Sequence, residues 1–204
     1  MISGFRAATE SEMVLAFLRG EIDSDRFGDD VRRALVAAGG LHLVRNPDLD
    51  SAQDNRAREQ ALSAARGWPD TGLFRGFPPN VEWHHGALPP EVLARVRFID
   101  YIYWNELSGG SRQPADVPAI IRSGQLPAWL TELGTDWCTQ FAAQLATAES
   151  VDDLIVMATP DLGRLVVLEG HARLTAVFVA GLQDRLPVRA FLGLSAGIDQ
   201  WKCF

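Results

Sequence analysis

The sequence predicts an α+β fold, in which a mainly helical region at residues 1–149 packs on a small mixed β-sheet lobe at residues 150–204. Apolar residues recur at helical spacing in the first part of the chain. After residue 150, short apolar runs bounded by turn residues take over, which is typical of buried strands. With 204 residues, of which 47% are apolar and 22% charged, the chain can bury a sizeable core. We expect the two regions to share one core.

Three helices are predicted before residue 70. Residues 10–20 carry an apolar stripe, with Ser11 as a candidate N-cap and Gly20 as a stop. Residues 23–40 combine an acidic first turn with a closing Gly-Gly pair. Residues 49–68 form a third helical pattern that ends near Gly67. The first third of the chain is therefore expected to be helical.

The middle of the chain predicts a connector followed by two more helices. Residues 68–90 contain five of the eleven prolines, which exclude a continuous helix and favour an irregular, aromatic connector. A helix is expected from the prolines at 89–90 to Leu107. Another is expected at 134–147, where Trp137, Phe141 and Leu145 follow one another at four-residue spacing.

The last 55 residues predict the order strand, turn, strand, helix, strand. The runs DDLIVMAT (152–159) and RLVVLEG (164–170) are short and apolar, and Pro160 and Gly163 lie between them. Residues 171–182 have helical spacing. In LPVRAFLGLS (186–195), Val188, Ala190 and Leu192 alternate with Arg189, Phe191 and Gly193, which is typical of a strand.

The junction between the second strand and the helix carries the main candidate site, Glu169-Gly170-His171-Ala172-Arg173. A glycine after a buried strand lets the backbone turn and approach a ligand, and the N–H groups of the following helix favour an anion. Arg173 can grip a phosphate or carboxylate, while His171 and Glu169 can move protons or hold a hydroxyl. Thr175 follows one turn later. Alternatively, Glu169 and Arg173 form an ordinary helix ion pair at i,i+4.

The run LVVLEGHARLTA, flanked by DDLIVMAT and LPVRAFLG, resembles the central motif of the ParB/sulfiredoxin-like superfamily, which includes the ParB-like nuclease domain family. The resemblance covers residues 150–193. It implies that Gly170, His171 and Arg173 line the phosphates of a bound nucleotide. It also implies that Glu169 corresponds to the acidic residue of the family's serine-kinase branch, although Ala172 replaces that branch's second histidine. The loop has no cysteine, so sulfiredoxin activity is not expected.

Two other stretches contain candidate residues. Ser108, Gly109, Gly110, Ser111 and Arg112 form either a loop that holds a phosphate or carboxylate or a simple helix C-cap, and Glu106 precedes them as a candidate acid or base. His84 and His85 are adjacent, so in an extended segment they point to opposite sides. We therefore predict no metal site there, and expect a surface or joining segment.

These observations predict a nucleotide-binding ParB-like protein that transfers phosphate from ATP or another nucleotide, with Mg2+, to a small polar substrate. The alternative is a non-catalytic module that senses a nucleotide or metabolite, with or without an association with DNA. The net charge of −7 and the lack of a Lys/Arg stripe make a nucleic-acid partner an unfavoured expectation. Two isolated cysteines, no signal segment and no bilayer-length apolar run favour a cytoplasmic protein without membrane contact.

Overall fold

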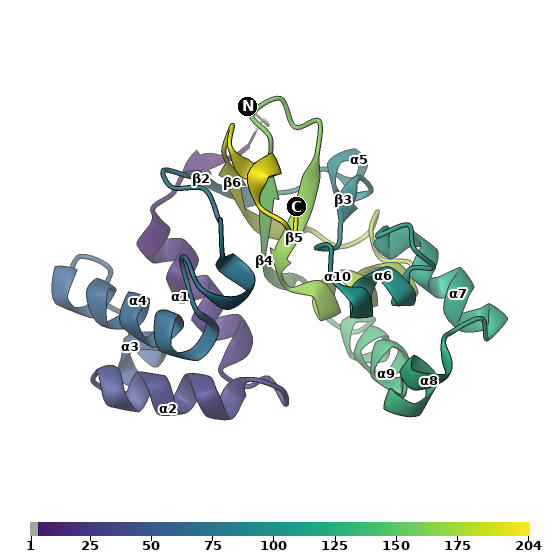
Figure 1. Ribbon diagram of the computed structural model, residues 1–204, viewed down its shortest axis with the longest axis horizontal. Helices are drawn as coiled ribbons and strands as arrows, with labels where there is room; N and C mark the ends of the chain where they lie inside the picture. Colours follow the sequence, from purple (N-terminus) through teal and green to yellow (C-terminus); the bar gives the residue numbers. More distant parts are fainter. Residues whose placement is uncertain (1–3) are drawn as a thin grey trace.

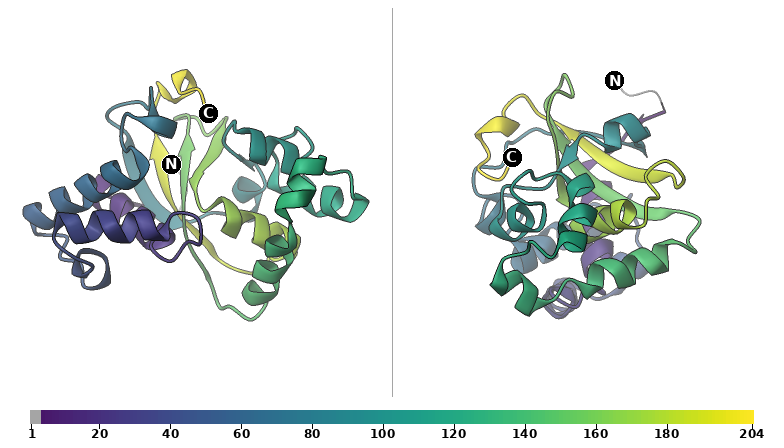
Figure 2. Two further views of the ribbon diagram at one scale, coloured as in Figure 1. Left: turned by 60° about the horizontal axis from the view of Figure 1, so that its bottom comes forward. Right: turned by 90° about the vertical axis from the view of Figure 1, so that its right-hand side faces the viewer.

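A single β-sheet with helices on both faces organises the molecule, which a computed structural model describes for residues 4–204. The sheet has the strand order β1-β2-β6-β4-β5-β3. Figure 1 shows helices α1–α4 on one side of the strands and α6–α10 on the other. The left view in Figure 2 shows the same three layers. The fold is α+β, as the sequence predicts.

The strands pair in both senses. Their bounds are β1 Arg6–Ala7, β2 Glu82–Ala87, β3 Val96–Arg97, β4 Val151–Ala158, β5 Leu165–Glu169 and β6 Val188–Leu194. Neighbours are antiparallel in β1/β2, β2/β6 and β4/β5, and parallel in β6/β4 and β5/β3. The three C-terminal strands therefore form the middle of the sheet, and strands from the first 149 residues extend it at both edges.

The helices divide between the two faces by chain order. The first face carries α1 Glu10–Glu21, α2 Gly28–Ala38, α3 His42–Arg45, α4 Ala52–Arg66 and the 3-10 turn η1 Gly72–Phe74. The second face carries α5 Pro90–Leu93, α6 Ile102–Leu107, η2 Pro114–Asp116, α7 Val117–Ser123, α8 Ala128–Leu133, α9 Asp136–Leu145 and α10 His171–Val179. A last turn, η3, spans Ile198–Gln200.

Alternation along the central strands fills a separate apolar core on each face. In β4, Ile155 and Met157 pack toward α1–α4, whereas Leu154 and Val156 pack toward α9 and α10. Because successive strand residues point to opposite faces, one strand can serve both layers only if it is apolar throughout. This explains the unbroken apolar run that made the C-terminal strands recognisable.

Most long elements confirm the sequence prediction. Helices α1, α2, α4 and α9 lie within the predicted stretches, and β4, β5, α10 and β6 appear in the predicted order. The cap of α1 is Thr9 rather than Ser11: the Thr9 side chain accepts a hydrogen bond from the Glu12 amide, and the Glu12 carboxylate accepts one from the Thr9 amide. This reciprocal pair satisfies two amides at the helix start.

Two predictions for the middle of the chain are wrong. The connector at 68–90 contains strand β2, which joins the sheet beside β6. The helix expected from residue 89 to 107 is interrupted by β3, because Val96 and Phe98 are buried while Arg95 and Arg97 are exposed. This two-residue alternation is typical of a strand and overrides the helical pattern around it. Helices α7 and α8 were not predicted. Across residues 4–204, no helix has the length and apolar character that crossing a bilayer requires.

Candidate functional site

The turn between β5 and α10 brings Glu169 and Arg173 together. Gly170 has a φ of 93°, a left-handed conformation that glycine adopts without steric cost. A Cβ at this position would lie 2.5 Å from Leu154 Cδ2 and 3.1 Å from Arg173 Nη2. The Arg173 guanidinium forms an ion pair with the Glu169 carboxylate. The structure therefore contains the i,i+4 pair that was one of the two interpretations of this motif.

Helix α1 approaches this ion pair at Gly20. A Cβ on Gly20 would lie 2.9 Å from Glu169 Oε2 and 3.0 Å from both terminal nitrogens of Arg173. Only a residue without a side chain lets the helix backbone come so close. Gly20 thus does not stop the helix, as the sequence suggested, but allows the last turn of α1 to cover the Glu169–Arg173 pair.

Two further charged side chains complete what we call the buried charge cluster: Glu21, Arg66, Glu169, His171 and Arg173. Glu21 follows Gly20 on α1 and forms an ion pair with Arg66 at the end of α4, with 3.4 Å between Arg66 Nη2 and Glu21 Oε1. The Arg66 guanidinium also lies 3.5 Å from the centre of the Phe27 ring, a favourable cation–π geometry. The four charged side chains of the cluster are each between 10% and 18% exposed.

Burial makes the two carboxyl groups of the cluster hard to ionise. It raises the pKa of Glu169 from 4.5 to about 7, against the opposing effect of the Arg173 charge. The pKa of Glu21 is also raised, again by burial and against the charge of Arg66. The Glu21 carboxylate adds to the rise in the pKa of Glu169. Near neutral pH, Glu169 can therefore either give or accept a proton.

His171 is held in an aromatic stack beside the charged groups. Its ring centre lies 4.8 Å from that of Trp104 and 6.0 Å from that of Phe98, with the rings nearly parallel. Burial lowers the pKa of His171 to about 3, and the positive charges of Arg66 and Arg173 act in the same direction. The imidazole is therefore neutral at physiological pH.

Several nitrogens of the cluster lack a protein partner. Arg66 Nε, Arg173 Nε and His171 Nε2 are buried, and none has a hydrogen-bond partner among residues 4–204. Buried polar atoms are nearly always paired in folded proteins, so three orphans in one cluster require an explanation. The arginine atoms are N–H donors, which an anion or a water molecule would satisfy.

Arg173 connects the cluster to an open cleft of about 490 Å3, which we call the α1 cleft. One wall is helix α1, with Ala16, Arg19 and Gly20, and the opposite wall is the sheet, with His85, Asp152, Asp153 and Phe191. Arg6 and Glu12 close one end. Clefts of 300 to 1,000 Å3 are the usual size for small-molecule sites.

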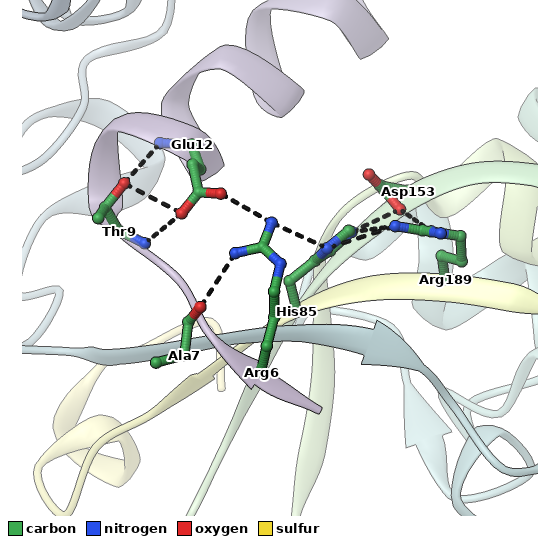
Figure 3. Close-up of polar contacts among 7 residues, drawn as sticks. All are labelled: Arg6, Ala7, Thr9, Glu12, His85, Asp153 and Arg189. Carbon is green, nitrogen blue, oxygen red and sulfur yellow. Dashed lines mark hydrogen bonds and ion pairs between the residues drawn. The ribbon is translucent and has the colours of Figure 1, made fainter. Parts of the chain in front are cut away.

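A hydrogen-bonded His–Asp pair lies in the sheet wall of this cleft (Figure 3). His85 Nε2 lies 3.0 Å from Asp153 Oδ1, and Asp153 also receives Arg189 Nε at 3.4 Å. The His85 ring stacks on Phe191, with 4.4 Å between ring centres. These contacts fix both the position and the orientation of the imidazole.

The other nitrogen of His85 faces two arginines. Nδ1 lies 3.4 Å from Arg6 Nη2 and 3.4 Å from Arg189 Nη2. Arg6 is itself paired with Glu12, at 2.7 Å (Figure 3). In one tautomer of His85, Nε2 carries the proton and donates a hydrogen bond to Asp153. Nδ1 is then an acceptor, which suits the surrounding guanidinium donors. A histidine oriented in this way by a carboxylate can serve as a general base.

The residues predicted from the sequence are split between two places. Arg173 lines the α1 cleft. Gly170 and His171 do not line the cleft, but they are close to Arg173 in the turn and first residues of α10. Arg112 instead lines a second cleft, whose lining shares no residue with the first. The loop at 108–112 satisfies many of its own polar groups: Ser108 Oγ donates to the Trp104 carbonyl and accepts from the Arg112 amide, and Ser111 Oγ donates to the Ser108 carbonyl. Gly109 and Gly110, at positive φ, form its turn.

Two other candidates lie outside both clefts. Thr175 is fully buried and its hydroxyl donates to the His171 carbonyl, 2.8 Å away, so it is engaged within α10. Glu106 is half-buried on α6 and lines neither cleft.

The sequence interpretation missed His85 and Asp153 as partners. His84 and His85 do point to opposite faces of the sheet. His84 pairs with Leu192, which packs in the core on the α9–α10 side, and His85 pairs with Phe191, which packs in the core on the α1–α4 side. The alternation in EWHHGA and the two acids at the start of β4 were the available signals, but no local pattern links residues 68 positions apart. Within residues 4–204, no group of three or more His, Cys, Asp or Glu side chains is arranged to hold a metal ion.

Comparisons with known proteins add no assignment to this geometry. The chain matches no family model, no curated protein and no solved structure. The resemblance to the ParB/sulfiredoxin-like superfamily therefore stays a prediction that rests on residues 150–193.

Proposed function

We propose that the α1 cleft binds a small phosphate-bearing ligand, and that the protein is a nucleotide-dependent phosphotransferase acting on a small polar substrate. The observation that carries this proposal is the set of buried, unpartnered nitrogens on Arg66, Arg173 and His171, beside a cleft that Arg173 lines. Arginine donors suit phosphate oxygens, and a ligand that reaches them would satisfy atoms that the protein leaves unpaired. The nucleotide is the ligand class that the sequence resemblance favours.

Two groups are suited to take a proton from a substrate hydroxyl: His85, which lines the cleft, and Glu169, which lies behind Arg173 as its ion-pair partner. Glu169 has a pKa of about 7, which lies near the working pH and so suits a general base. His85, oriented by Asp153, is the second candidate. In the proposed transfer, the substrate hydroxyl oxygen bonds to the terminal phosphorus of a nucleoside triphosphate. The bond between this phosphorus and the bridging oxygen breaks, and the nucleoside diphosphate leaves. The hydroxyl proton passes to Glu169 or His85.

A magnesium ion would be brought in with the nucleotide, not held by a protein cage. The cleft offers Asp152 and Asp153, which fits an ion that is usually bound through one or two carboxylates and the substrate phosphates. Bound there, Mg2+ would neutralise charge that develops on the phosphate oxygens.

Thermal-shift titrations with ATP, ADP, CTP and GTP, each with and without Mg2+, test the binding step. A nucleotide at 100 times its Kd stabilises the native state by about 2.7 kcal/mol, which for a chain of this size raises Tm by about 5 to 10 °C. Arg173→Lys keeps the charge but loses the planar donor pair, so its response should be much smaller. Arg56→Gln, an exposed change on α4, is the control. If no nucleotide shifts Tm, or if Arg173→Lys responds like the wild type, the proposal fails.

A non-catalytic sensing module is the second candidate, because Arg173 already has the Glu169 carboxylate as a partner. A ligand that displaced Glu169 from this pair would change the contacts of α1, which lies against both side chains. Nucleotide binding without release of ADP or phosphate, over a panel of small hydroxyl compounds, would favour this candidate over the transferase.

A further inference from the structure

A second cleft lies on the opposite edge of the sheet and is lined by four arginines. It has a volume of about 480 Å3. We call it the arginine cleft, after Arg95, Arg97, Arg112 and Arg164. Its other lining residues, among them Gln113 and Val166, carry no charge. This concentration of positive charge occurs in a chain whose net charge is −7.

The fold itself forces these arginines together. Arg97 lies on β3 and Arg95 in the turn directly before it, so both arginines lie at this edge of the sheet. β3 pairs in parallel with β5 through Val96 and Leu165, and Arg95 and Arg164 each come one residue before that pair. Like charges on neighbouring strand positions are destabilising. The arrangement therefore costs stability unless something else neutralises it.

Protein carboxylates offset the charge of the cleft only from a distance: Asp100 acts on Arg112, and Asp161 on Arg95. Among residues 4–204, none of the four arginines forms an ion pair within 4.0 Å. The two nearby acids are used by other donors. Asp161 accepts from the Thr159 hydroxyl at 2.6 Å and the Gly163 amide at 2.9 Å, and Asp100 accepts from the Asn105 amide group at 2.8 Å.

The four guanidinium groups differ in how they are held. Arg95 donates to the Leu162 carbonyl oxygen. Arg112 donates to the carbonyl oxygens of Phe98, Cys203 and Phe204 and so ties two distant segments together. Arg164 lies 4.4 Å from the Phe204 ring centre. Arg97 is exposed, and its side chain has no hydrogen-bond partner within residues 4–204. Arg112 is thus held in place by backbone carbonyl groups, whereas Arg97 and Arg164 have N–H donors that are free to bind a ligand.

We propose that the arginine cleft is a binding site for a small molecule with at least two phosphate groups, separate from the α1 cleft. Planar guanidinium groups bind phosphate oxygens through paired hydrogen bonds, and several of them in one concave site suit a polyphosphate better than a single anion. The concave shape and the acidic surface of the rest of the chain favour a small molecule over a nucleic acid. The site goes beyond the proposed transferase, because it needs no residue of the α1 cleft.

Titration calorimetry of the full chain with inorganic pyrophosphate tests the proposal, with citrate as a non-phosphate polyanion. Arg97→Gln and Arg164→Gln should each weaken pyrophosphate binding about tenfold or more, because a charge-assisted hydrogen bond is lost. Arg97→Lys should restore part of the affinity. Arg56→Gln, which removes one exposed charge from α4, should bind pyrophosphate like the wild type.

The outcomes separate the two sites. If Arg97→Gln and Arg164→Gln, with unchanged circular dichroism and Tm, bind pyrophosphate as tightly as Arg56→Gln does, the arginine cleft is not the site and the proposal is overturned. It is also overturned if the wild type binds no pyrophosphate, or binds citrate equally well. Loss of binding in Arg173→Lys alone would assign the phosphate to the α1 cleft instead. Failure of the nucleotide screen leaves this test intact, because Arg97 and Arg164, whose variants decide it, lie outside the α1 cleft.

Discussion

Replacing Glu169 by glutamine removes the ionisable group with the clearest energetic consequence in the cluster. Glutamine has nearly the same shape, so the packing against Gly20 and the turn at Gly170 can persist. Burial holds the pKa of Glu169 at about 7 instead of 4.5. The folded protein therefore favours the protonated carboxyl, and folding becomes less favourable as pH rises from 4.5 to about 7.

The size of the effect follows from the pKa change. A rise from 4.5 to about 7, at 1.36 kcal/mol per pKa unit, corresponds to about 3 kcal/mol. The contribution of Glu169 is fully present below pH 4.5 and is lost by pH 7. Glu169→Gln does not titrate, so its unfolding free energy, minus that of the wild type, should rise by about 3 kcal/mol over this interval and stay level above it.

Urea denaturation at half-unit pH steps from 4 to 8.5 measures this difference. Other titrating groups, including His171, are present in both proteins and largely cancel in the subtraction. A difference that stays flat, or that falls as pH rises, would mean that Glu169 is already ionised in the folded protein at pH 4.5. The argument that burial outweighs the Arg173 charge would then be refuted.

Three further predictions address neighbouring residues. His171→Phe keeps the stack on Trp104 but removes a ring whose pKa burial lowers to about 3; the wild type should lose up to about 5 kcal/mol between pH 6.5 and 3 relative to this variant, as acid denaturation curves will show. Gly170→Ala combines left-handed strain with a 2.5 Å contact to Leu154 and should cost about 2 to 5 kcal/mol. Gly181→Ala, at positive φ with nothing within 4 Å of the added Cβ, should cost only about 1 to 2 kcal/mol. Equal losses of unfolding free energy for the two alanine variants in urea would contradict the contact between residue 170 and Leu154. His85→Gln loses the stack on Phe191 and should cost about 1 kcal/mol of stability. It should abolish any hydroxyl-dependent turnover of the folded protein, and full retained turnover would remove His85 from the mechanism.

Local patterns predicted the long elements because each of them carries its own periodicity. Helices α1, α4 and α9 have apolar stripes, and β4, β5 and β6 are apolar runs bounded by turns. The strands that were missed are short or mixed in pattern: β1 and β3 have two residues each. Such strands form only because a longer neighbour offers free backbone groups, which no local pattern reveals.

The same distinction separates the parts of the site. Glu169, Gly170, His171 and Arg173 are contiguous, so one motif predicts them. The rest of the buried charge cluster and the His–Asp pair join residues from α1, α4, β2 and β4. Their side chains meet only because the sheet places β2 two strands away from β4 and because Gly20 lets α1 come close. A single sequence contains no signal for such pairings.

The energetics of the cluster favour a functional origin for it. Burial raises the pKa of both Glu21 and Glu169, so at neutral pH each of these two carboxyl groups is less favourable in the folded chain than in the unfolded one. Burial lowers the pKa of His171, which makes this group unfavourable in the folded chain below pH 6.5. Three buried nitrogens add unmet hydrogen bonds. A cluster that served stability alone would be expected to lack such groups, whereas strained and desolvated charges are characteristic of binding and catalytic sites. Glu169→Gln decides between these origins: a variant that is more stable than the wild type above pH 7, and that has lost ligand response, shows that the chain keeps this carboxyl for function.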